Sequence, residues 1–113
     1  MLKKSFRLRK NEDFSRVFRQ GTPLFFGAIG CKIVKNNENH LRVGFSFSKK
    51  HLRTAVSRNR LRRVIIAHFQ ETGSTILRSP QDVVFFTVRQ PEHNGLQPFA
   101  SWVQSVVEYI GSK

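Results

Sequence analysis

The chain has 113 residues, of which 39% are hydrophobic, and it carries 20 lysines and arginines against 7 aspartates and glutamates, a formal net charge of +13. This length suits one domain with a single core, and so large a basic excess favours a polyanionic partner. The lone cysteine, Cys31, excludes an intramolecular disulfide, and no window approaches the roughly 18 apolar residues that span a bilayer, so we expect a cytoplasmic protein without membrane contact.

The positive charge is concentrated in the first half of the chain. Residues 1–63 hold seventeen basic and three acidic residues, whereas residues 64–113 hold three and four. Disordered cationic tails are poor in apolar residues, but phenylalanines and valines are interspersed with this charge throughout. We therefore predict one folded basic domain over residues 1–113, with residues 1–10 as an extended basic arm.

A short helix is predicted directly after the arm, in the segment NEDFSRVFRQG. Asn11 is a suitable N-cap, the two acids that follow it suit the positive end of the helix dipole, and Gly21 can end the helix. One face of this helix carries Phe14, Val17 and Phe18.

Strands are predicted on either side of a turn at NNEN, residues 36–39. The first is AIGCKIVK at 28–35, and the second is LRVGFSFS at 41–48, where apolar and small or polar residues alternate strictly. Its predicted apolar face carries Leu41, Val43, Phe45 and Phe47, and its open face carries Arg42, Gly44, Ser46 and Ser48.

The next predicted helix combines an arginine cluster with an apolar stripe. Thr54 can cap a helix over residues 55–70 that ends at Gly73. At 100° per residue the apolar side carries Leu61, Val64, Ile65, His68 and Phe69. The opposite side carries Asn59, Arg62 and Arg63, flanked by Arg58 and Arg60.

Two further elements complete the expected order. DVVFFTVR at 82–89 is a nearly continuous apolar run, typical of a strand buried on both faces, and its approach through a helix indicates a β-α-β unit. A last amphipathic helix begins near Pro98 and carries Phe99, Trp102, Val103, Val106 and Ile110.

The charge pattern of the arginine helix favours nucleic acid over a solvated surface. Lys49 to Arg63 contains seven basic residues and no acid, whereas solvated helix faces usually mix both signs. Guanidinium groups suit bidentate phosphate contacts. For the first helix two interpretations stay open: Phe14 and Phe18 either dock it on the sheet or stack unpaired bases.

Side-chain catalysis is disfavoured. The carboxylates are scattered, the four histidines form no HxH or HxxxH pair, and a GxxxxGK[ST] phosphate loop is absent from the sequence. We therefore expect neither catalytic residues nor a metal site in this chain.

Four segments in order, RLRKNEDFSRVFRQG, LRVGFSFSKK, AVSRNRLRRVIIAHF and DVVFFTVRQP, carry a resemblance that spans nearly the whole chain. The sequence resembles the protein component of bacterial ribonuclease P, and SRNRLRR looks like the RNR signature of that family. The resemblance implies an α/β (α+β) fold of the ribosomal S5 domain 2-like type, with the order α-β-β-β-α-β-α and a left-handed β-α-β crossover.

The resemblance also implies a function and partners. A protein of this family binds a large catalytic RNA, and together they remove the 5′ leader of precursor tRNA by phosphodiester hydrolysis. The active site then lies in the RNA, with Mg²⁺ bound mainly there, and no obligate protein partner is evident.

Carried over by position, the resemblance assigns two sets of residues. The set expected to bind the catalytic RNA is Arg58, Asn59, Arg60, Arg62, Arg63 and Lys49. The set expected to bind the leader is Phe14, Phe18, Lys32, Ser46, Ser48 and Lys50.

Three positions depart from the pattern of the family. Lys32 stands where an aromatic residue is common, and Gly27 and Ile66 stand where arginine is frequent. At the first two positions we expect a phosphate contact in place of stacking, and at Ile66 we expect the loss of one RNA contact.

Two alternatives use the same residues. A ribosomal or general RNA-binding protein with no role in cleavage would carry a similar basic helix. An anionic-membrane-binding domain is disfavoured, because the apolar side of the arginine helix is expected to be buried against the sheet.

Overall fold

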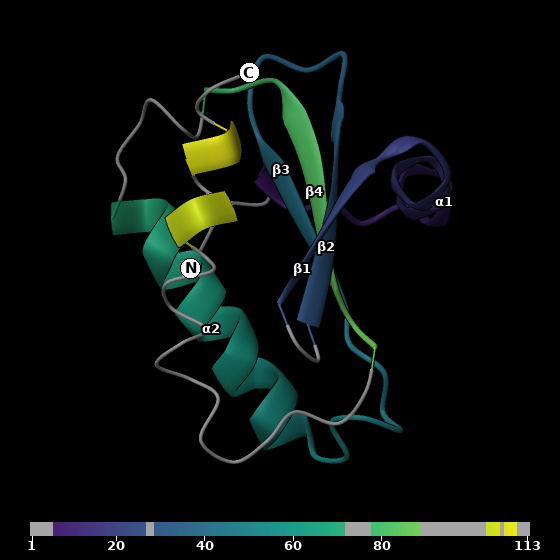
Figure 1. Cartoon of the computed structure of the whole chain (residues 1–113), viewed down its shortest axis with the longest axis vertical. Helices are drawn as coiled ribbons and strands as arrows, with labels where there is room; N and C mark the ends of the chain where they lie inside the picture. The colour runs from purple at the N-terminus through teal and green to yellow at the C-terminus, as the bar shows by residue number, and fades with distance from the viewer. Residues whose placement is uncertain (1–5, 27–28, 72–77, 89–103, 107, 111–113) are drawn as a thin grey trace.

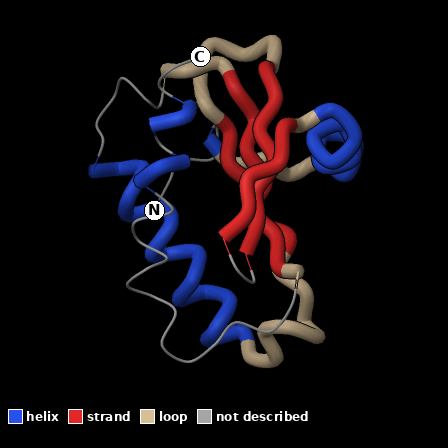
Figure 2. The backbone as a smooth tube through the Cα atoms, in the orientation of Figure 1, coloured by secondary structure: helices blue, strands red, loops and turns tan. Residues whose placement is uncertain are grey.

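A mixed four-stranded sheet with helices on both faces is the framework of the chain in its computed structural model (Figure 1, Figure 2). The structure describes residues 6–26, 29–71, 78–88, 104–106 and 108–110. The elements in chain order are α1 (Asn11–Gln20), β1 (Thr22–Phe26), β2 (Ile29–Lys35), β3 (Arg42–Ser46), α2 (Ala55–Glu71) and β4 (Gln81–Thr87).

The strands lie in the order β1-β2-β4-β3. β1 and β2 are antiparallel, as are β2 and β4, whereas β3 and β4 are parallel. The parallel pair with α2 between its strands is the predicted β-α-β unit, and the mixed α and β class is confirmed. The left-handed sense of that crossover stays an implication of the resemblance.

Strand β1 is the described element that the local sequence pattern did not predict. Its sequence TPLFF lacks alternation and contains Pro23. β1 is an edge strand, which pairs with a neighbouring strand on one side only. Proline is tolerated there although it lacks an N–H donor. At the other end of the chain, residues 104–106 and 108–110 are helical, whereas Gly73 and the predicted helix start at Pro98 lie outside the described residues.

The predicted cap of α1 is wrong by one residue. The helix begins at Asn11, and Lys10 occupies the N-cap position without a side-chain hydrogen bond. The backbone carbonyl of Lys10 accepts from the N–H groups of Asp13 and Phe14, both at 3.1 Å, so the main chain alone starts the helix. The helix ends before Gly21 as predicted, and a Cβ there would lie 2.5 Å from the Val17 carbonyl oxygen.

The larger part of the core lies between the sheet and α2. Figure 2 shows α1 on one side of the sheet and α2 on the other. The predicted alternation places Val43 and Phe47 toward α2, where they are buried together with Ile65 and Phe69 of the helix. Smaller apolar contacts hold α1, with Val17 buried against Leu8 and Val84.

A buried carboxylate joins the elements on the α1 side. Asp82 of β4 has no exposed surface and accepts two hydrogen bonds of 2.8 Å from Arg42 of β3 and one of 2.8 Å from Asn36. Arg16 of α1 also donates to it. Burial by itself raises the pKa of Asp82, but the hydrogen bonds from Arg42, Asn36 and Arg16 and the positive charge of Arg42 together lower the pKa below its ordinary value.

We predict that Asp82→Asn destabilises the fold by about 3 kcal/mol at pH 7, because it leaves the half-buried donors of Arg42 and Arg16 without their anion. A carboxylate with a lowered native pKa contributes stability that is fully present above its unfolded pKa of about 3.9 and is lost as the pH falls further. Urea unfolding at pH 7 and pH 3 measures both effects. The gap between wild type and variant should shrink at pH 3, and a gap of equal size would contradict this assignment.

Candidate nucleic-acid interface

The arginine cluster occupies the first half of α2 and is preorganised by local hydrogen bonds. The hydroxyl of Thr54 accepts from the Ser57 N–H at 3.1 Å, which confirms the predicted cap. Arg58 donates to the Leu52 carbonyl at 2.8 Å, and Arg62 donates to the Asn59 amide oxygen at 2.7 Å. Asn59 and Arg62 therefore lie together on one ridge, with polar atoms left for a ligand.

The cations of this helix lack carboxylate partners within the described chain. Ion pairs with described acids are made by Arg16 and Arg42, and none is made by the arginines of α2. Arg60 and Arg63 are exposed, as is Lys49 in the loop before the helix. Like charges so arranged repel one another, and an external polyanion relieves this repulsion.

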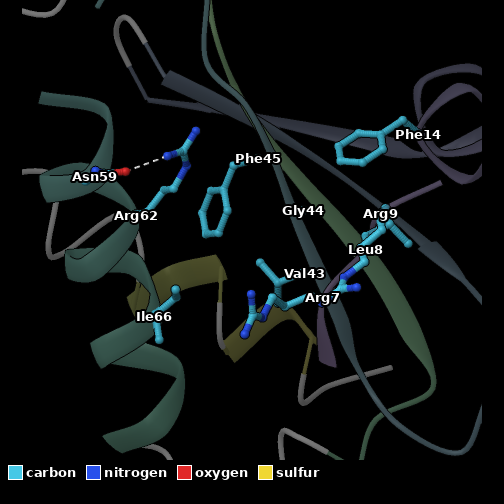
Figure 3. A pocket seen from close by; sticks show the side chains of 10 residues that line it. All are labelled: Arg7, Leu8, Arg9, Phe14, Val43, Gly44, Phe45, Asn59, Arg62 and Ile66. Carbon is cyan, nitrogen blue, oxygen red and sulfur yellow. Dashed lines mark hydrogen bonds between the residues drawn. The ribbon is translucent and has the colours of Figure 1, made fainter. Parts of the chain in front are cut away.

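A groove of about 360 Å³ brings residues of both predicted sets together (Figure 3). Figure 3 shows Phe14 on one side of β3 and Asn59, Arg62 and Ile66 on the other, so the groove passes around the edge of this strand. The lining residues are Arg7, Leu8, Arg9, Phe14, Val43, Gly44, Phe45, Asn59, Arg62 and Ile66.

Phe14 reaches this groove because Gly44 has no side chain. A Cβ on Gly44 would lie 2.7 Å from Cζ of the Phe14 ring and 3.0 Å from Cβ of Leu8. The half-buried ring packs against the cluster of Leu8, Val17 and Val84, as the docking interpretation predicts, and it also lines the groove. Base stacking on Phe14 stays a prediction.

Phe18 and Lys32 lie together outside the groove, at the end of α1. The Lys32 ammonium donates to the Phe18 carbonyl at 2.6 Å and lies 5.6 Å from the centroid of the Phe18 ring. Lys32 therefore binds a helix C-terminus, where a cation is favourable. An ammonium group has three donors, so this contact leaves two of them for a phosphate.

The remaining predicted leader residues flank the end of β3. Ser46 is exposed. The hydroxyl of Ser48 accepts from the Lys50 N–H at 3.1 Å, and the Ser48 N–H donates to the Thr87 hydroxyl at 3.0 Å. Ser48 thus shapes the loop that follows β3, and the exposed side chain of Lys50 extends from this loop.

The arm contributes three groove residues that the sequence reasoning missed, Arg7, Leu8 and Arg9. The Leu8 N–H donates to the Val43 carbonyl at 2.9 Å, which docks the arm on the free edge of β3. Leu8 is buried, and its exposed neighbours Arg7 and Arg9 line the groove. The alternation of arginine, leucine and arginine was the available signal for this arrangement.

The departure at Ile66 changes the wall of the groove. Ile66 is 8% exposed and lines the groove beside Arg62, so it adds an apolar side chain to a wall that also carries Asn59 and Arg62. The departure at Gly27 lies outside the described residues.

Two other kinds of site, a metal centre and a membrane-spanning helix, are not found in the described part of the chain. It contains no cluster of three His, Cys, Asp or Glu side chains that could hold a metal ion, and none of its helices is long and apolar enough to span a membrane. Burial raises the pKa of the Cys31 thiol to about 12, so this group is protonated and unreactive at neutral pH.

Comparison with known proteins gives a consistent result. The family model described as Ribonuclease P matches residues 2–108. The ribonuclease P protein component of Listeria monocytogenes serotype 4b is 37% identical over 94 residues, which cover 82% of this chain and 76% of the relative.

Solved structures show the same fold. The RNase P protein of Staphylococcus aureus matches with a TM-score of 0.72 and 30% identity, over 95% of this chain and 93% of that chain. The RNase P protein of Thermotoga maritima matches with a TM-score of 0.67 at 21% identity, over 95% of this chain and 96% of that chain.

We predict that Arg62→Ala combined with Arg63→Ala weakens binding to a folded RNA and flattens the salt dependence of the affinity. Each lost phosphate contact lowers the slope of log K against log salt by roughly one. The dissociation constant, measured across a salt series, gives the slope. Lys35→Ala with Arg78→Ala is the matched control, because it removes the same charge from exposed positions outside α2. Equal slopes for the two double variants would contradict a phosphate role for Arg62 and Arg63.

Proposed function

The chain belongs to the family of ribonuclease P protein components, and from this premise we propose that it binds the catalytic RNA through α2 and the 5′ leader of precursor tRNA through the α1 side of the sheet. As a protein component of ribonuclease P, it functions in tRNA 5′ processing, as part of an endoribonuclease complex that includes an RNA subunit. A general RNA-binding protein with no role in cleavage is not favoured.

The single observation that carries the proposal is the groove around the edge of β3. Its α2 wall presents Asn59 and Arg62, and its α1 wall presents the ring of Phe14. Guanidinium groups suit a folded RNA rich in phosphate, whereas an accessible ring suits unpaired bases. One strand edge thus holds a structured RNA next to a single-stranded one, which is what leader removal requires.

The protein contributes cations rather than a reacting group. Each phosphate that is neutralised by a lysine or arginine replaces condensed counterions, so two RNAs approach one another more easily. Arg60, Arg62 and Arg63 supply such charge along α2.

The carboxylates around β3 do not fit a resident Mg²⁺. Asp13, Glu38 and Asp82 all lie within ion-pair distance of Arg42, which places a positive charge where the metal ion would bind. We assign the active site and its Mg²⁺ to the RNA subunit, and we place the holoenzyme in the cytoplasm.

Leader binding favours turnover as well as affinity. A precursor contacts the α1 wall of the groove through its leader, whereas the mature product lacks the segment that contacts Phe14. Binding energy from the leader is therefore absent in the product complex, and product is released more readily.

Cleavage of a precursor tRNA at low Mg²⁺ tests this function. The catalytic RNA alone, the protein alone and the two together are compared by mapping the 5′ end of the product. We expect the mature 5′ end when both are present, because the protein supplies cationic charge that RNA otherwise obtains from ions. If the protein binds the RNA tightly but leaves the cleavage rate unchanged, it is a general RNA-binding protein.

We also predict that Phe14→Ala weakens binding of precursor tRNA by roughly tenfold while mature tRNA is bound as before, since one base–ring stack contributes about 1–3 kcal/mol. Equilibrium binding of both tRNAs to the holoenzyme measures this. A thermal melt of the variant separates loss of the ring from loss of the fold, because Phe14 also packs on Leu8 and Val17. Equal losses for the two tRNAs would contradict a leader contact.

A further inference from the structure

A row of residues crosses all four strands next to the proposed leader surface. Phe25 of β1 pairs with Gly30 of β2, Gly30 pairs with Phe86 of β4, and Phe86 pairs with Ser46 of β3. The row therefore ends at Ser46, which belongs to the predicted leader set. Phe25 and Phe86 belong to neither predicted set, and neither residue lines the groove.

Gly30 lets two rings close over the middle of the sheet. A Cβ at Gly30 would lie 2.8 Å from Cδ1 of Phe25 and 2.8 Å from Cζ of Phe86. The rings of Phe25 and Phe86 meet edge to face, with centroids 5.9 Å apart. Phe86 in turn lies 5.6 Å from the Phe18 ring, so three aromatic rings from β1, β4 and α1 are in continuous contact.

The outer end of this row is open to solvent. Phe25 is 58% exposed and Phe86 is half-buried. In Figure 1, α1 lies beside the upper part of the sheet, away from the end of the β1–β2 hairpin where Phe25 and Gly30 lie. The core on this face is formed by Leu8, Val17 and Val84, so burial in that core does not account for Phe25.

The charge beside the rings identifies the class of ligand. Lys32 lies two residues from Gly30 on β2 and therefore on the same face of the sheet. Its ammonium is 5.6 Å from the Phe18 centroid and donates a hydrogen bond to the Phe18 carbonyl. Rings beside a cation with remaining donors match a nucleotide, whose base stacks while its phosphate binds the ammonium.

We propose that Phe25 and Phe86 form a second base-stacking subsite, which takes an unpaired leader base farther from the cleavage site than the base at Phe14. This inference rests on the proposed function, because the same RNA strand must cross the groove before it reaches the row. Ser46 links the two places, since it lies two residues from Gly44 on the same face of β3. The subsite predicts a preference for longer leaders and for a purine at one leader position, because purines offer the larger stacking surface.

The test uses the holoenzyme with precursor tRNAs of stepwise increasing leader length, each carrying 2-aminopurine at its outermost position. Phe25→Leu removes the flat ring but keeps an apolar side chain at an exposed site, and Phe25→Tyr is the matched control that keeps the ring. We expect Phe25→Leu to lose roughly five- to tenfold in affinity for leaders that reach the row, the lower end of what base–aromatic stacking contributes. Shorter leaders and mature tRNA should bind as they do to wild type.

Fluorescence of the 2-aminopurine provides a second measurement. Stacking on Phe25 should quench the probe at one leader position in wild type and Phe25→Tyr, and Phe25→Leu should restore its emission. If Phe25→Leu matches wild type at every leader length while Phe14→Ala still discriminates precursor from mature tRNA, the second subsite is wrong and the proposed function stands. If neither variant discriminates, the leader role itself fails. A change in sedimentation mass of the free protein on Phe25→Leu would make this row a self-association surface and overturn the proposal.

Discussion

The ionic cluster around Asp82 is the constraint on which the α1 side of the molecule depends. A carboxylate without exposed surface is stable there because Arg42, Asn36 and Arg16 satisfy it from three different segments. These bonds fix β3 against β4 and hold α1 over the sheet. Since Gly44 lies two residues beyond Arg42 on the same face, the cluster also sets the place where the Phe14 ring meets the strand. A structural ion pair thus positions the proposed leader surface.

The edge position of β3 explains why two kinds of RNA surface lie side by side. A central strand would be paired on both sides, so no groove could pass around it from the α1 face of the sheet to the α2 face. At the edge, the Leu8 contact with Val43 occupies one point of the strand, and the groove extends from there past Gly44 and Phe45 to Arg62. The Arg62 guanidinium and the Phe14 ring therefore lie on opposite sides of one edge strand and line the same groove.

Local patterns in the sequence predicted elements well where the cause is local. Alternation identified β3, Thr54 identified the start of α2, and the absence of acids between Lys49 and Arg63 identified the cationic face. The groove required long-range pairing, which no local pattern reports, so the contribution of Arg7 and Arg9 was missed. The same limit applies to Asp82, which the sequence presents as the first residue of an apolar strand and the structure shows to be the partner of Arg42.

Two glycines on one face of the sheet reveal a shared principle. Gly44 underlies Phe14, and Gly30 underlies Phe25 and Phe86, and in each place a Cβ would lie less than 3.0 Å from a ring atom. Glycine weakens a strand interior, so its presence there commonly marks a close approach by another group. Here the approaching groups are aromatic rings, held near the sheet by positions that have no side chain of their own. The sheet face beside α1 is therefore a surface on which aromatic rings pack closely. At its exposed end, the ring of Phe25 is accessible for stacking by the base that we propose as its ligand.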